Sequence, residues 1–291
     1  MSKIGIPEPT VEDALDIQHD PFPADDHGIA KRIPHLGHVA LFLAMLAFSL
    51  LVSVALFRVV LHGHPQLREN SLVELASEAV IYILTLILSF KIFPLLWKRP
   101  FLDGIEFNTL AVRRNWGRLL GGGIALCLFS ECMERFFTPP KSTDLDKILS
   151  TQSGAWAALL LGVFLAPLFE EIVFRGFLLP AFATAYDWLS LDRSPAGLER
   201  WRNSTAHTTP AKVFGALLSS VLFGLLHAPQ LHYAWGAVFV ILCVGLVLAF
   251  VRLRLHSLAC STLVHMTYNG TLFAFMLIWT HGFRHLDRLQ S

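Results

Sequence analysis

The sequence predicts an all-α protein, a polytopic transmembrane helix bundle of about seven or eight spans, and three observations carry this prediction. Of its 291 residues, 54% are apolar and only 15% are charged, whereas soluble domains carry roughly 25% charged residues. The mean hydropathy is +0.55. The apolar residues also form long blocks, and a helix needs about 20 of them to cross a bilayer. Most of the chain is therefore expected inside a membrane.

Seven apolar blocks are long enough to span a bilayer, or nearly so, and an eighth span would arise if one long block broke. In chain order they cover 38–61, 73–97, 117–137, 155–183, 211–228, 233–251 and 257–280. Residues 1–35 are polar and rich in proline, which is typical of a disordered tail. We therefore predict a tail over 1–35 and a membrane-embedded domain over 36–285.

The loops between the blocks differ in their content of lysine and arginine, which sets the orientation of membrane proteins. By alternation the basic loops share one side of the membrane, and they contain Lys98, Arg99, Arg113, Arg114, Arg118, Arg193, Arg200, Arg202, Arg252 and Arg254. This side is predicted to be cytoplasmic, together with the N-terminus, in an integral protein of a bacterial inner membrane. The net charge of +1 gives no reason to expect a nucleic-acid partner.

The stretch APLFEEIVFRGFLLP (166–180) places three ionisable residues inside the fourth block. A charge in the middle of a membrane helix costs roughly 2.5–3.5 kcal/mol. Glu171 and Arg175 are four residues apart, so they share a helix face and can form an ion pair. Glu170 points about 100° away from Glu171 and has no such partner. A carboxylate left available in this way suits a general base, although all three charges could instead mark a helix end at the interface.

Further polar side chains lie in two later blocks. His265 and Asn269 are four residues apart and reach the same side of the last block, and His227 ends a separate one. Each of them alone is more often a packing group than a catalyst. Together with Glu170, however, they are the groups needed to activate a water molecule and to hold an oxyanion.

These residues fall into three motifs, EExxxR (Glu170, Glu171, Arg175), FxxxH (Phe223, His227) and HxxxN (His265, Asn269). In this order on apolar helices, the motifs resemble the CAAX-prenyl endopeptidase and bacteriocin-processing family, the Abi or type II CAAX proteases. The resemblance covers about 166–272, within an expected family core of about 155–280. It implies a helical membrane bundle that encloses a catalytic cavity, and an intramembrane endopeptidase activity.

The resemblance also implies a role for each residue. Glu170 would be the catalytic carboxylate, and His227 would help it to polarise the attacking water. His265 and Asn269 would stabilise the oxyanion, while Glu171 and Arg175 would support the site. Members of the family are described both as metalloproteases and as metal-free glutamate proteases. Metal-free catalysis is favoured because no HExxH motif is present; the alternative is a divalent metal such as zinc on Glu170, His227 and His265.

The expected substrate is a peptide or a membrane protein, with or without an attached lipid, and the expected environment is the lipid bilayer. Helix lengths place Glu170 and His227 at different depths in upright helices, so both helices are expected to protrude into the cytoplasm, where the cavity would open. The alternative function is a non-catalytic membrane scaffold or a bacteriocin-immunity protein that retains the fold. Substitution of Glu170 by alanine would separate the two, since only a protease would lose its phenotype.

Overall fold

A computed structural model describes residues 32–67, 70–137 and 143–289, and within these ranges the protein is helical and contains no strand. The predicted tail over 1–35 therefore lies almost wholly outside the described residues. The long helices are α1 (Leu36–Gly63), α2 (Ser71–Trp97), α4 (Thr109–Glu134), α10 (Thr209–His227), α11 (Trp235–Leu255) and α12 (Leu258–Trp279). The short ones are η1 (Pro65–Leu67), α3 (Phe101–Gly104), α5 (Asp144–Ile148), α9 (Pro195–Asn203) and η4 (Leu286–Leu289).

A further helix is built from five consecutive segments, α6 (Gln152–Leu160), η2 (Leu161–Leu165), α7 (Ala166–Glu171), η3 (Ile172–Leu178) and α8 (Leu179–Leu189). η2 and η3 are π-helical. Such turns close their hydrogen bonds from i to i+5 and are frequent at functional sites. Here they come directly before and directly after the short α-helical segment that carries Glu170 and Glu171.

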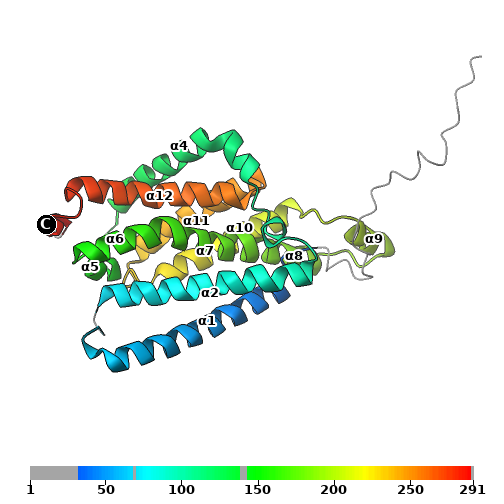
Figure 1. Cartoon of the computed structure of the whole chain (residues 1–291). Helices are drawn as coiled ribbons and strands as arrows, with labels where there is room; N and C mark the ends of the chain where they lie inside the picture. Colours follow the sequence, from blue (N-terminus) through cyan, green and yellow to red (C-terminus); the bar gives the residue numbers. More distant parts are fainter. Residues whose placement is uncertain (1–31, 68–69, 138–142, 290–291) are drawn as a thin grey trace, which may run out of the picture.

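The long helices run between two ends of the bundle (Figure 1). We call the end that holds the start of α1, the α2–α3 junction, α9 and the α11–α12 turn the basic end, since it carries the arginine- and lysine-rich loops. The other end, called the C-terminal end, holds η1, α5, residues 228–234 and the C-terminus. The path of the chain thus gathers the basic loops on one side, as the sequence predicted.

Among the described residues, five helices are long and apolar enough to cross a membrane, so the chain is an integral membrane protein with five candidate spans in this part. They are Leu36–Gly63, Ser71–Trp97, Gln152–Leu189, Thr209–His227 and Trp235–Leu255. The sequence predicted about seven or eight spans, which is more than these five. The fourth block forms one continuous helix, so the break that would have added an eighth span does not occur. α4 and α12 have comparable lengths but are not among these five, and α4 carries three arginines in its first half.

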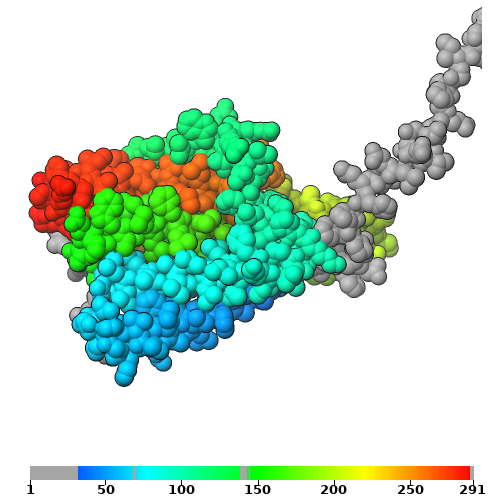
Figure 2. Space-filling model, in the orientation of Figure 1, coloured from blue at the N-terminus to red at the C-terminus, as the bar shows by residue number. Residues whose placement is uncertain are grey.

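The surface of the bundle carries large apolar side chains, as expected where helices meet lipid. Leu51 and Val59 on α1 and Leu95 on α2 are among the most exposed. Figure 2 shows these two helices, in blue and cyan, along one edge of the molecule. The outward faces of α1 and α2 therefore suit the hydrocarbon core of a bilayer.

An aromatic cluster fastens this α1–α2 pair to the long central helix. Its buried members include Phe42 of α1, Phe93 and Trp97 of α2, Phe101 of α3 and Phe177 of η3. The ring centroids of Phe42 and Phe177 are 4.7 Å apart, and those of Phe93 and Phe177 are 4.9 Å apart. Contacts between rings at these distances are favourable, and they hold the segment that follows the two glutamates in place.

Candidate active site

The predicted ion pair between Glu171 and Arg175 is present and completely buried. Nη1 of Arg175 donates to Oε1 of Glu171 over 2.9 Å, and both side chains have no exposed surface. Nη2 of Arg175 donates to the backbone carbonyl of Gly245 in α11, also over 2.9 Å. The Arg175 guanidinium lies 4.5 Å from the centre of the Phe223 ring. A buried charge pair must find such partners, because an unpaired charge would be very costly there.

His265 of α12 lies between the two glutamates. Its Nδ1 is 3.2 Å from Oε1 of Glu171, and its Nε2 is 3.7 Å from Oε2 of Glu170. Glu171 already accepts a hydrogen bond from Arg175, so it is the acceptor and Nδ1 carries the proton. Nε2 is then the nitrogen that faces Glu170. The result is a continuous line of ionisable groups, Arg175–Glu171–His265–Glu170.

His227 joins this line through Phe223 rather than through a contact with Glu170. Its Nδ1 lies 2.7 Å from the carbonyl oxygen of Phe223. A carbonyl can only accept, so Nδ1 is protonated and Nε2 has a free lone pair in the neutral ring. The Phe223 ring packs against both histidines, with centroids 4.7 Å from His227 and 5.8 Å from His265. The spacing of FxxxH thus places the aromatic ring and the imidazole side by side.

Asn269 is held by the first π-helical segment. Its Nδ2 donates to the carbonyl oxygen of Gly162 over 2.7 Å. In η2 the backbone hydrogen bonds run from residue i to residue i+5, and the Asn269 amide donates to one backbone carbonyl of this segment. A second amide hydrogen remains on Nδ2. α12 is therefore positioned against the central helix by the same side chain that the sequence singled out.

A cavity of about 450 Å³ reaches two of the predicted site residues, whereas His227 and His265 do not line it. Glu170 and Asn269 are part of its wall, as are Glu74 in the first turn of α2, Leu145 in α5 and Gln230 after α10. The last three lie at the C-terminal end of the bundle. Glu170 is 22% exposed, whereas Glu171 is fully enclosed. One carboxylate of the pair is consequently accessible and the other is not.

The position of this cavity corrects one prediction. The sequence predicted a cavity that opens on the side of the basic loops, yet the cavity runs from Glu170 to the C-terminal end. The fourth block was predicted to end at 183, whereas the central helix continues to Leu189, so Glu170 lies about as far from the basic end as His227 does. Protruding helices on the basic side are therefore not needed to bring the motifs together.

A residue that the sequence reasoning missed also lines this cavity. Glu78 of α2 contributes to the wall and interacts electrostatically with Glu170. Its Oε1 accepts a hydrogen bond from the Tyr82 hydroxyl. The Tyr82 ring stacks on Phe169, the residue before Glu170, with centroids 4.2 Å apart. The available signal was an acid inside the second apolar block, which also contains Glu74 and Lys91.

The alternative metal site would use Glu170, His227 and His265 as its ligands. Among the residues that the structure describes, no group of three or more His, Cys, Asp and Glu side chains is arranged to hold a metal ion. Nδ1 of His265 faces Glu171 and that of His227 faces Phe223, so Nε2 is the nitrogen that each ring has left for another partner. As placed, Glu170, His227 and His265 are not gathered around one point, and the metal dependence of the chain stays a prediction.

The structure thus brings together the three motifs, which lie on the central helix, α10 and α12. Glu170, Glu171, Arg175 and His265 are linked in one line, His227 adjoins it through Phe223, and Asn269 lies in the same cavity wall as Glu170. A neighbouring carboxylate and imidazole beside an accessible cavity are groups that can take up and release protons.

Comparison with known proteins adds independent information. No curated protein and no solved structure matches the chain. A family model described as type II CAAX prenyl endopeptidase Rce1-like matches residues 152–271. This range begins at the first residue of the central helix and includes all three motifs. Over residues 152–271 the chain is therefore similar to the Rce1-like type II CAAX prenyl endopeptidases, a family of peptidases, and the resemblance drawn from the motifs is confirmed.

Proposed function

We propose that this protein is an intramembrane endopeptidase in which Glu170 activates a water molecule for attack on a peptide bond. The observation that carries the proposal is the line Arg175–Glu171–His265–Glu170, which ends in an accessible carboxylate at a cavity wall. The family match supports hydrolysis of a peptide bond, since the family is one of peptidases.

In the proposed reaction, the Glu170 carboxylate accepts a proton from water as the oxygen attacks the carbonyl carbon. The Glu170 carboxylic acid then returns that proton to the nitrogen of the departing amine, so the carboxylate is regenerated. Nε2 of His227, left unprotonated by the hydrogen bond of Nδ1 to Phe223, is suited to orient the attacking water. A general base of this kind typically contributes 10²–10⁴-fold to the rate.

The negative oxygen of the tetrahedral intermediate needs hydrogen-bond donors. The second Nδ2 hydrogen of Asn269 is one candidate, because its first hydrogen is used by Gly162. Protonated Nε2 of His265 is the other, and the buried Glu171 carboxylate beneath the ring would stabilise that positive charge. The ion pair with Arg175 in turn keeps Glu171 ionised and fixed.

The proposed mechanism requires no metal. We assign proton transfer to Glu170 and orientation of the water to His227, and among the described residues no group of three such side chains is arranged to hold a metal ion. Glu78 is proposed as a positioning residue. Two carboxylates facing one cavity disfavour simultaneous ionisation, so Glu78 would help to set which of them holds a proton.

The proposed substrate enters from the side opposite the basic loops. If those loops are cytoplasmic, as their lysines and arginines favour, the cavity mouth faces the other side of the membrane. The substrate would then be an extracytoplasmic segment of a membrane protein or of a lipid-anchored peptide. The lining of the mouth is mixed, with Leu145, Ile148 and Leu231 beside Glu74 and Gln230, which suits a peptide near the interface.

The proposal is tested by comparing the membrane proteomes of cells that express the wild type, Glu170→Gln or Glu131→Gln. Glu131 is an exposed acid on α4 and serves as the matched control. We expect uncut precursors to accumulate with Glu170→Gln alone, and the purified wild type to cleave those precursors in liposomes with or without a chelator. Equal proteomes for wild type and Glu170→Gln would contradict the peptidase and favour a scaffold.

A further inference from the structure

A second cavity lies at the basic end, remote from Glu170. Its volume is about 360 Å³. The wall is formed by the segment before α1, the region between α2 and α4, the start of α8, residues 205–212 and the end of α11. No residue of the three family motifs contributes to it. The cavity is therefore separate from the proposed peptidase site.

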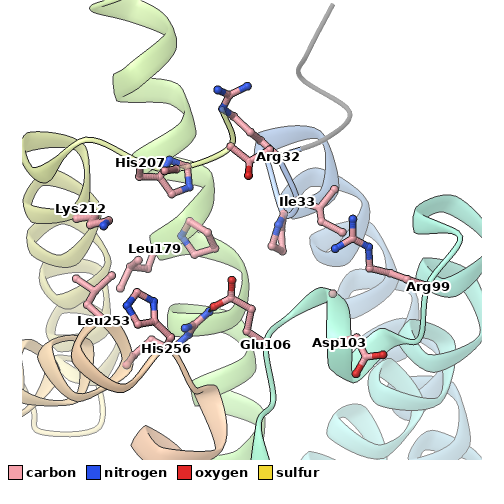
Figure 3. Close-up of a pocket in the computed structure, with 16 residues that line it drawn as sticks. Arg32, Ile33, Arg99, Asp103, Glu106, Leu179, His207, Lys212, Leu253 and His256 are labelled. Atoms are coloured by element: carbon pink, nitrogen blue, oxygen red, sulfur yellow. Dashed lines mark ion pairs between the residues drawn. The ribbon is translucent and has the colours of Figure 1, made fainter. Parts of the chain in front are cut away.

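The charges around this cavity are predominantly positive. Four permanently cationic side chains line it, and two carboxylates oppose them, those of Asp103 and Glu106. Arg252 and Glu106 form an ion pair of 2.8 Å, so this carboxylate is already engaged. In Figure 3, Lys212 and Arg99 approach from opposite walls, with Glu106 and His256 between them. The hollow thus carries an excess of positive charge.

The positive charge of Lys212 does not contribute to the stability of its helix. It lies in the first turn of α10, where the positive end of the helix dipole disfavours a cation. It is half-buried, and within the part of the chain that the structure describes its ammonium group has no hydrogen-bond or ion-pair partner. A cation held against a dipole without compensation is explained more readily by an anionic ligand than by helix stability.

Part of the cavity wall is apolar and lies where the helices leave the bilayer. Ile33, Pro34, Leu179 and Leu253 line it alongside the cations. α1 begins at Leu36 and α11 ends at Leu255, so the cavity lies where spans emerge from the bilayer. Basic pockets between helices on the cytoplasmic side are recurrent sites for anionic lipid headgroups.

We propose that this cavity binds a phosphate group, as presented by an anionic phospholipid headgroup or by a free phosphate, with Lys212, Arg99 and His256 as its donors. The lipid would extend its acyl chains along Leu179 and Leu253 toward the hydrocarbon region. Arg252 would stay with Glu106 and shape the floor. The proposal is independent of peptidase activity, because the ligand acts at the opposite end of the bundle.

The test measures binding to the purified full-length protein in a neutral detergent. Thermal unfolding and native mass spectrometry are recorded with short-chain phosphatidylglycerol, with short-chain phosphatidylcholine and with inorganic phosphate. The variants are Lys212→Ala, the conservative Lys212→Arg, and Arg254→Ala. Arg254 is an exposed residue on the last turn of α11 that does not line the cavity, so it is the matched control.

We expect phosphatidylglycerol to raise the unfolding temperature of the wild type and of Arg254→Ala, and to bind about fivefold more weakly to Lys212→Ala. Lys212→Arg should restore binding. A response to inorganic phosphate as well would identify the phosphate itself as the recognised group, whereas a response to phosphatidylglycerol alone would identify the lipid. Equal responses to both lipids, or equal binding by Lys212→Ala and Arg254→Ala, would overturn the proposal. Should Lys212→Ala not fold, Lys212→Gln gives the same comparison.

Discussion

Replacement of Arg175 by methionine tests whether the buried ion pair holds the site together. The substitution keeps much of the side-chain volume but leaves the Glu171 carboxylate without its main counter-charge. Both side chains are fully buried, and breaking such a pair costs about 3–5 kcal/mol. The carbonyl of Gly245 also loses its donor, which adds about 1 kcal/mol or more. We therefore expect a loss of roughly 4–6 kcal/mol in the free energy of unfolding.

The magnitude is measured by unfolding in mixed detergent, followed by tryptophan fluorescence. The double variant Arg175→Met with Glu171→Gln removes both charges, so it should recover at least about 2 kcal/mol relative to the sum of the single losses. Arg254→Met, on the exposed face of α11, should change stability by less than about 0.5 kcal/mol. If Arg175→Met were no worse than Arg254→Met, or if the two single losses simply added, the ion pair could not have the role described.

Three further predictions concern the cavity and its surroundings. Asn269→Ala should lower kcat by about 10²–10³-fold with little change in KM, and an unchanged kcat in a peptide-cleavage assay would exclude Asn269 as an oxyanion donor. Glu78→Gln should shift the pH profile of cleavage while leaving unfolding stability nearly unchanged; a uniform loss of rate at every pH would instead indicate a structural role. Gln230→Cys should react with an impermeant maleimide on intact cells and Arg193→Cys should not, and the reverse pattern would place the cavity mouth in the cytoplasm.

Most of the secondary structure could be predicted because long apolar blocks leave few alternatives to a helix in a membrane. The fourth block shows which features of a helix composition does not predict. Composition predicted a helix over 155–183, and the structure extends it to Gln152–Leu189. Its two π-helical turns were not predicted, nor was the hydrogen bond that Asn269 donates to the carbonyl of Gly162 in the first of them.

The contacts within the candidate site were likewise predicted only in part. The bond between Glu171 and Arg175 follows from their spacing on one helix and was predicted. The contact of His265 with both glutamates involves residues nearly a hundred positions apart, so spacing alone could not provide it. Glu78 was missed for a related reason, since its importance arises only when α2 packs beside Glu170. Roles for these side chains stay predictions until they are assayed.

The two π-helical turns have a consequence for chain length. Each acts as an extra residue wound into the helix, so removing one residue from Leu161–Leu165 could restore regular winding. Because the π turn already absorbs that residue, the side chains beyond it would keep their direction, whereas removal of one residue from the regular segment α6 would rotate them by about 100°. Only the deletion in α6 would turn Glu170 away from the cavity wall, although neither deletion alters a chemical group of the site. The position of a one-residue deletion in the central helix therefore decides whether the carboxylate still reaches the cavity.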